Sequence, residues 1–198
     1  EGATYPPPGL TAADIRRNLA MFCDFLRQTP AGFRKTVESY YRTPANTLSF
    51  EGIDYGFRAL TYGKGTYQCG LDEALIIETE IPERAPYWNV QLNDPYFNAL
   101  EYVYRLSSIN GQMAKLSSDG KFRAVIALTD PGVPNWLDPA GYKEGGIYGR
   151  WYDCDSEPVP SLTRVKLAEL RETEAVWLPG YKVAEVGGTA ALGLVALG

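Results

Sequence analysis

Apolar residues recur every three or four positions between residues 11 and 44, and this spacing predicts amphipathic helix. Thr11 followed by Asp14 fits a capped helix start, because hydroxyl and carboxylate oxygens accept hydrogen bonds from the first turn. Thr29 and Pro30 resemble a second start, since proline is favoured in the first helical turn. We therefore expect two short N-terminal helices packed on the rest of the chain.

Beyond these helices the pattern changes to short runs of β-branched and aromatic residues separated by Gly, Pro, Asn and Asp. The run ALIIETEI is apolar without interruption at first and is expected to lie deeper than its neighbours. Asp119-Gly120 predicts a hairpin turn, because glycine accepts the positive φ that such turns need. Candidate strands cover residues 47–50, 53–60, 66–69, 74–81, 87–92, 100–107, 122–129, 146–153 and 164–170. Short connections between them predict a mainly β, antiparallel sandwich or barrel.

Four segments organise the chain. Residues 1–10 contain YPPPG and form a linker-like lead-in, residues 11–44 are helical, residues 45–180 hold the strands, and residues 181–198 form an apolar tail rich in Gly and Ala. The tail is shorter than the ~20 apolar residues that cross a bilayer, so no membrane span is expected. Because the chain starts without methionine, we interpret it as a fragment, a processed chain or an excised domain.

The charge and residue content exclude several classes of function. A formal net charge of −5 without a basic cluster excludes a nucleic-acid-binding surface of the usual kind. The chain has no histidine, which excludes Ser-His-Asp and Cys-His catalysis and zinc sites of the HExxH type. Any chemistry must therefore use carboxylates, Tyr, Lys, Arg, Cys or backbone groups.

Cysteines and carboxylates show no pattern of a metal or cofactor site. Cys23, Cys69 and Cys154 are far apart in the sequence and form no CxxC pair. Buried reduced thiols are expected, and a bridge between Cys69 and Cys154 remains the alternative. The sequence predicts no cofactor and no bound metal.

Several segments together carry a family resemblance: YWNVQLND (87–94), SSIN (107–110), DGKFRAVIALTDPGVPNWLDPAG (119–141), GGIYGRW (145–151) and PVP (158–160). Their order resembles the bacterial domain-of-unknown-function 1214 family (DUF 1214). That resemblance implies a jelly-roll β-sandwich, usually the C-terminal half of a longer protein whose N-terminal half is a related β-domain. It implies no established reaction.

The loop DPGVPNWLDPAG at 130–141 combines three prolines with a tryptophan directly after a predicted strand. Proline fixes φ, so this loop holds Asp130, Asn135, Trp136 and Asp138 in place with little loss of entropy. One interpretation is a rigid corner in which Trp136 closes one end of the core. The other is the wall of a ligand pocket at the mouth of the sandwich.

Two predicted strands present polar side chains on one face each. Asn89 and Gln91 alternate with apolar residues, so their amides suit either a ligand or an exposed sheet face. In GIYGRWYD, Tyr148 and Arg150 share a face with Tyr152. Arg150 could hold a carboxylate or sulfate in a forked geometry, or form an internal ion pair with a carboxylate of the loop, Asp130 or Asp138.

Three functional hypotheses follow. The first is a jelly-roll module that binds a small apolar-polar or sugar-like ligand, packs against a sister N-terminal β-domain, or forms a homo-oligomer. The second is a hydrolase, lyase or isomerase with Asp130 or Asp138 as acid/base, Arg150 as anion clamp, and Tyr148 or Trp136 as a wall. The third is a structural shell or filament subunit.

Overall fold

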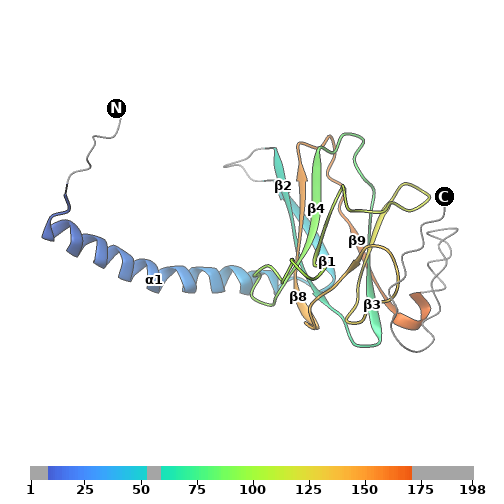
Figure 1. Ribbon diagram of the computed structural model, residues 1–198, viewed down its shortest axis with the longest axis horizontal. Coiled ribbons are helices and arrows are strands. Elements are labelled where there is room, and N and C mark those ends of the chain that lie inside the picture. Colours follow the sequence, from blue (N-terminus) through green and yellow to red (C-terminus); the bar gives the residue numbers. More distant parts are fainter. Residues whose placement is uncertain (1–8, 53–58, 171–198) are drawn as a thin grey trace. The chain divides into compact units, whose positions relative to one another are not determined.

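The computed structural model describes residues 9–52 and 59–170 (Figure 1). The chain divides into two compact units, Glu1–Thr43 and Pro44–Gly198. Most of the predicted strand at 53–60, the apolar tail at 181–198 and most of the lead-in at 1–10 lie outside the described residues.

The first unit holds α1 (Ala12–Tyr40), a helix of 29 residues. Its predicted cap is confirmed: the Thr11 hydroxyl oxygen accepts a hydrogen bond from the Asp14 backbone N–H at 3.2 Å, and the Asp14 carboxylate accepts one from the Thr11 N–H at 3.0 Å. This reciprocal pair satisfies two backbone donors at a helix start that would otherwise lack partners.

The prediction of two separate helices is wrong, because α1 continues through Pro30. Proline removes one backbone donor and crowds the preceding turn, which normally favours a helix end. The sequence nevertheless carried the opposite signal, since Leu26, Phe33 and Val37 keep one helical face on both sides of Pro30. The packing of this helix on the β-unit stays a prediction.

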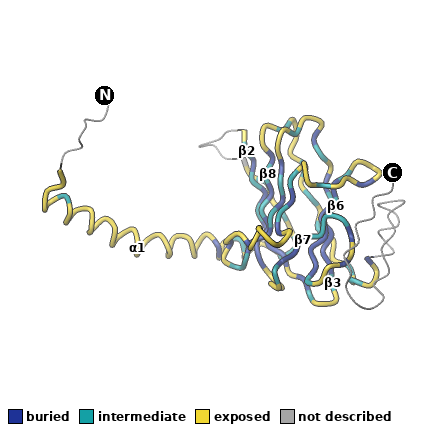
Figure 2. Tube along the Cα trace, viewed as in Figure 1, coloured by how far each residue is buried: buried dark blue, intermediate teal, exposed yellow. Residues whose placement is uncertain are grey.

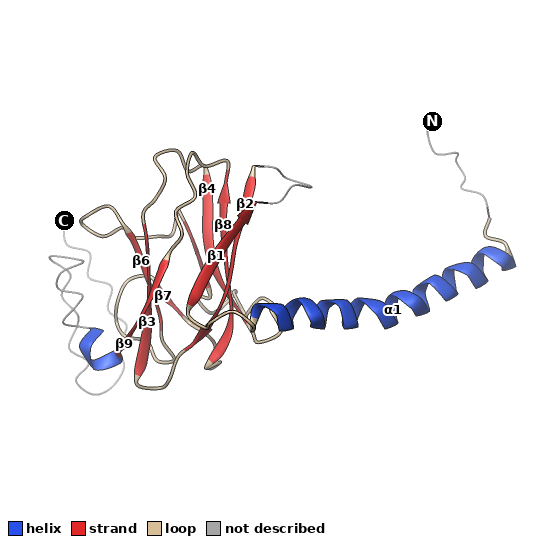
Figure 3. Ribbon diagram, turned by 180° about the vertical axis from the view of Figure 1, so that it is seen from behind, coloured by secondary structure: helices blue, strands red, loops and turns tan. Residues whose placement is uncertain are grey.

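The second unit is mainly β, as predicted, and contains two sheets (Figures 1 and 3). The five-stranded sheet has the order β1 (Thr47–Gly52), β2 (Leu60–Gln68), β8 (Glu144–Tyr152), β4 (Tyr87–Asn93) and β5 (Ser108–Asn110). The four-stranded sheet has the order β7 (Trp136–Leu137), β6 (Phe122–Ile126), β3 (Glu73–Thr79) and β9 (Ser161–Lys166). Neighbouring strands are antiparallel except β6 and β7, which run parallel.

The two sheets share one core between their inner faces (Figure 2). Trp88 and Trp151 of the five-stranded sheet lie in it, and the ring of Phe122 from β6 meets Trp88 edge-on with centroids 4.7 Å apart. Such aromatic pairs add about 1 kcal/mol to the stabilisation that comes from the area they bury. This shared core makes the unit a two-layer β-structure.

A second apolar cluster covers the other face of the four-stranded sheet. Ile76 and Val125 of this sheet pack there with Val133 and Leu170 from the segments that follow β6 and β9. Residues 74–77 of β3 are therefore all buried, alternately in the two clusters. Burial on both faces explains why the run ALIIETEI lies deep, as its uninterrupted apolar start predicted.

Three predicted strands differ in the structure. Residues 100–107 form no strand, because the Glu101 carboxylate accepts the backbone N–H groups of Val103 and Tyr104 and turns the chain. The predicted strand at 66–69 is the end of the longer β2. The predicted strand at 164–170 is the end of β9 and a following helical turn.

Glycines hid the first half of β2 from the strand pattern. A Cβ at Gly63 would meet the ring of Phe50, and one at Gly65 would meet the backbone oxygen of Thr47. Both contacts lie across the pairing of β1 with β2, so glycine is required for close packing at these two positions. The sequence pattern therefore left these residues out of the predicted strands, although the glycines stand in β2 because a larger side chain would not fit.

The predicted turn at Asp119-Gly120 is confirmed. Gly120 has a φ of +81° and donates its backbone N–H to the oxygen of Ser117 at 2.9 Å, where the chain reverses into β6. Arg123 at the start of β6 donates to both carboxylate oxygens of Asp119, at 2.9 and 2.8 Å, and to Glu78 on β3 at 2.6 Å. An ion-pair network thus joins the turn to the sheet.

This network lowers the pKa of both carboxyl groups. The hydrogen bond from Arg123 holds the pKa of Asp119 at about 2, below its ordinary 3.8. Burial raises the pKa of Glu78, but hydrogen bonds from Lys121 and Arg123 outweigh it and leave the pKa lowered. Because the folded pKa values lie below the unfolded ones, the stabilisation is present above the unfolded pKa and lost as pH falls through the folded one.

We predict that the urea midpoint of the protein falls as pH is lowered from 5 towards 2, and that Asp119→Asn makes this fall smaller. The variant lacks one carboxyl group whose pKa is lower in the folded than in the unfolded state, so less of its stability depends on pH. Asp130→Asn is the control, because the Asp130 carboxylate accepts a backbone N–H of its own loop, from Gly132. Equal pH dependence of the wild type and Asp119→Asn would contradict the prediction.

Candidate functional site

The loop at 130–141 is organised by Asn135, which adopts a φ of +56°. Its side-chain amide donates to the backbone oxygens of Lys115 and Arg123, both at 2.7 Å, and its side-chain oxygen accepts the Lys115 N–H at 3.0 Å. The next residue, Trp136, starts β7 and donates its indole N–H to the Ala127 oxygen at 2.9 Å. Asn135 and Trp136 thus tie the loop to β6.

The two aspartates of this loop are also engaged locally. Asp138 is buried, accepts the Ala140 N–H at 2.8 Å and forms an ion pair with Arg105 at 2.7 Å. Asp130 is exposed and accepts the Gly132 N–H at 2.8 Å. These contacts match the interpretation of the loop as a rigid corner.

The structure brings four other predicted site residues together on the outer face of the five-stranded sheet. In the pairing of β4 with β8, Asn89 lies opposite Arg150 and Gln91 lies opposite Tyr148. Tyr62 of β2 lies opposite Arg150 on its other side. We call these five residues, Tyr62, Asn89, Gln91, Tyr148 and Arg150, the Arg150 face.

Arg150 is held at the centre of this face. Its Nη1 donates to the side-chain oxygens of Asn89 and Gln91 at 3.3 and 3.4 Å. The guanidinium carbon lies 5.6 Å from the ring centroid of Tyr62 and 5.8 Å from that of Tyr148, within the range of cation–π attraction. Two amides and two rings therefore surround the guanidinium, and no carboxylate of the described residues contacts it.

The expected ion pair between Arg150 and Asp130 or Asp138 is wrong. Asp138 pairs with Arg105 instead, and no carboxylate within the described part of the chain pairs with Arg150. The reason is the alternation of side chains along β8. Gly149 and Trp151 face the core, so Arg150 between them points to the outer face. Asp138 follows β7 of the other sheet.

Tyr148 is supported from the side by Phe97. The two rings meet edge-on with centroids 5.5 Å apart, and the Phe97 backbone oxygen accepts a 2.8 Å hydrogen bond from the buried amide of Asn93. Phe97 lies over Gly146, where a Cβ would come within 2.6 Å of its ring. Glycine at this position lets the loop after β4 pack against the sheet.

Sequence reasoning missed Tyr62 and Lys64, which contribute to the same outer face from β2. Lys64 lies opposite Tyr148, next to the row that holds Tyr62 and Arg150. The signal was present in YGKG, where polar residues alternate with the two glycines that face Phe50 and β1. Alternation with glycine, rather than with apolar residues, was the pattern to recognise.

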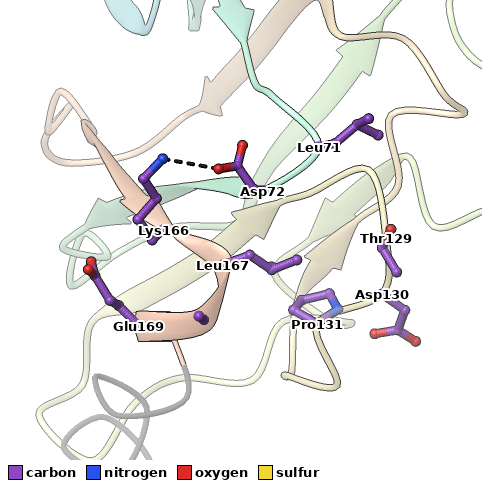
Figure 4. A pocket seen from close by; sticks show the side chains of 9 residues that line it. Leu71, Asp72, Thr129, Asp130, Pro131, Lys166, Leu167 and Glu169 are labelled. Carbon is purple, nitrogen blue, oxygen red and sulfur yellow. Dashed lines mark hydrogen bonds and ion pairs between the residues drawn. The ribbon is translucent and has the colours of Figure 1, made fainter.

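The cavity between the sheets has no carboxylate in its lining, whereas carboxylates line a depression that is open to solvent. A cavity of about 20 Å³ lies between the sheets beside Phe50, Trp88 and Trp151, large enough for about one water molecule. An open depression of about 830 Å³ lies between β9 and the segments flanking β3 and β6 (Figure 4). Asp130 lines this depression, where Asp72 and Lys166 form an ion pair at 3.1 Å.

The thiols and carboxylates of the described residues form no evident reactive centre. All three cysteines are free, and Cys23 is exposed rather than buried as predicted, because the apolar face of α1 on which it lies is itself exposed. Burial raises the pKa of Cys69 to about 11, which disfavours the reactive thiolate. Within residues 9–52 and 59–170, no group of three or more His, Cys, Asp or Glu side chains is placed to hold a metal ion.

The chain is similar to several solved structures. The crystal structure of an uncharacterized protein from Burkholderia cenocepacia matches 83% of this chain and 47% of its own, with 29% identity and a TM-score of 0.75. A protein from Vibrio parahaemolyticus matches 80% of this chain and 47% of its own, with 15% identity and a TM-score of 0.44. The chain therefore spans about half the length of each. No protein-family model and no curated protein matches the sequence.

We predict that Asn135→Ala lowers the free energy of unfolding by about 2 to 4 kcal/mol, because three hydrogen bonds of about 1 kcal/mol each are lost and alanine disfavours positive φ. Asn135→Gly is the matched variant, since glycine accepts this φ and should recover about 1 kcal/mol. Urea unfolding measures both. If Asn135→Ala and Asn135→Gly both unfold with the same free energy as the wild type, Asn135 does not organise the loop.

Proposed function

We propose that this chain is a jelly-roll module of the DUF 1214 family that binds a small ligand with polar and apolar parts on the Arg150 face, without catalysing a reaction. The jelly-roll assignment is supported by the course of the chain, which passes repeatedly between the two sheets, and by the motifs DPGVPNWLD and GRW. The comparisons supply no ligand and no reaction.

The observation that carries the proposal is the convergence of the Arg150 face. Three adjacent strands contribute half-buried polar side chains and two aromatic rings to one surface, in a register fixed by the sheet. Side chains on strands are held more rigidly than side chains on loops, so a ligand meets groups that are already in place. Amides and tyrosine hydroxyls suit hydroxyl and carbonyl groups of a ligand.

A carboxylate-based enzyme is less well supported. Such an enzyme needs an acid or base beside its substrate, within a site that excludes water. Asp138 already pairs with Arg105 and caps Ala140, and the cavity between the sheets has no carboxylate in its lining. A shell or filament subunit has no observation in its favour within the described residues.

The binding proposal predicts that neutral probes shift amide resonances of β2, β4 and β8. We expect glucose or benzyl alcohol, titrated into ¹⁵N-labelled protein, to shift resonances around Lys64, Asn89 and Arg150 with millimolar affinity, typical of small unoptimised ligands. Tyr62→Ala should remove these shifts. Tyr102→Ala is the matched control, because Tyr102 is 71% exposed on the loop before β5.

Failure of both probes to shift this face, or shifts confined to the depression beside Lys166, would overturn the placement of the binding surface. A thermal unfolding curve of Tyr62→Ala separates loss of binding from loss of folding.

A second candidate role, packing against a sister β-domain, is favoured by α1. Its apolar side chains Leu19, Phe22, Leu26 and Phe33 are 49 to 59% exposed, and α1 is the only described element of its unit. A helix with such a face normally buries it against another element. We favour a sister domain over a second copy because the similar protein from Burkholderia cenocepacia is about twice as long as this chain.

We predict that the isolated chain is a monomer that binds the dye ANS, and that Phe22→Ser with Leu26→Ser reduces this binding severalfold. Light scattering and dye fluorescence measure the two properties. The matched control replaces Arg27 and Gln28, on the polar side of the same helix, with serine. A dimer that the paired substitution dissociates would assign the apolar face to self-association, and a monomer that binds no dye would remove the partner proposal.

Within the described residues, no helix has both the length and the apolar character that crossing a bilayer requires.

A further inference from the structure

We propose that the Arg150 face anchors its ligand through a carboxylate, and that the flat apolar body of this ligand lies against Tyr62 and Tyr148. This inference rests on the proposed binding face and adds the chemical class of the ligand.

Arg150 differs from every other described arginine of its unit. Four arginines have a carboxylate partner within 4 Å: Arg84 with Asp153, Arg105 with Asp138, Arg123 with Asp119 and Glu78, and Arg164 with Glu73. Arg150 has none among the described residues, although it is half-buried on a sheet. A partly buried cation without a counter-charge gives up some of its hydration, so a carboxylate from a ligand would complete the site.

One edge of the Arg150 guanidinium, formed by Nε and Nη2, is available for such a carboxylate. Both of its hydrogen bonds leave from Nη1, towards the oxygens of Asn89 and Gln91. Nε and Nη2 donate to no described residue, and together they form the planar fork that matches the two oxygens of a carboxylate. The side-chain Nδ2 of Asn89 likewise has no acceptor among the described residues, which supplies a further donor beside the fork.

The charge of the surrounding sheet supports an anionic ligand. The chain carries a net charge of −5, yet Arg150 and Lys64 are neighbours in adjacent rows of this outer face. Glu51 lies at the edge of the Arg150 row, on β1 beyond Tyr62. Arg150 itself therefore places a positive charge at the centre of this face within an acidic protein, which favours approach of anions.

The rings of Tyr62 and Tyr148 indicate which kind of group lies next to the carboxylate in the ligand. Their rings flank the guanidinium, and the Tyr148 ring continues into Phe97. Cation–π contacts hold Arg150 in place before binding, so less entropy is lost when the carboxylate arrives. A planar aromatic or short aliphatic body beside the carboxylate fits this surface better than a highly charged one such as a phosphate ester.

Benzoate and its neutral analogue benzamide test the inference. We expect benzoate, titrated into the ¹⁵N-labelled full chain, to shift the Nε–H resonance of Arg150 with a Kd in the millimolar range, at least about tenfold tighter than benzamide. Arg150→Gln should abolish this binding, and Arg150→Lys should weaken it about fivefold or more because the fork is lost. Arg84→Gln is the matched control and should leave benzoate binding unchanged, since Arg84 already pairs with Asp153 and contributes no side chain to the Arg150 face.

The outcomes separate the ligand class from the binding face. The carboxylate class would be overturned, and the binding face kept, if benzoate and benzamide bound these strands with equal affinity. Displacement of benzoate by sulfate of equal affinity would have the same meaning. No shift of β2, β4 or β8 by benzoate, benzamide or the neutral probes would overturn both. Circular dichroism and the melting temperature of the two Arg150 variants confirm that they fold.

Discussion

The alternation of β8 is the constraint on which the rest of this structure depends. This strand pairs with β2 on one side and β4 on the other, so its side chains decide what both neighbours bury and expose. Ile147 and Trp151 point into the core, which leaves Tyr148 and Arg150 on the outer face. A shift of register by one residue would place a guanidinium in the core and a tryptophan in water, so core packing also holds the Arg150 face in register.

Much of this architecture could be predicted, because it follows from local periodicity. The alternation in YWNVQLND and GIYGRWYD placed Asn89, Gln91, Tyr148 and Arg150 on strand faces before their strands were known to be neighbours. That β4 and β8 are neighbours could not be predicted, because pairing between strands far apart in sequence depends on the global fold. The position of Tyr62 beside Arg150 was not predicted, because the glycines that follow it are more typical of a turn than of a strand.

The loop at 130–141 shows why unusual composition alone is a poor guide to a binding site. Its prolines, tryptophan and aspartates suggested a pocket as readily as a corner. In the structure Asn135 and Trp136 bond to backbone oxygens, and Asp138 meets Arg105. Backbone groups in an irregular segment need partners, and side chains in fixed positions supply them. The segment DPGVPNWLD thus has a structural reason within this fold.

The two sheets differ in how much of their faces is buried. The four-stranded sheet is covered on both sides, whereas the five-stranded sheet contributes one face to the core and leaves the Arg150 face outward, beside the loop after β4 that packs over Gly146. Substitutions on that outward face leave the buried contacts intact, so stability imposes few demands on which polar residue stands there. The polar residues at the centre of this surface can thus change without disturbing the interior of the two-layer β-structure.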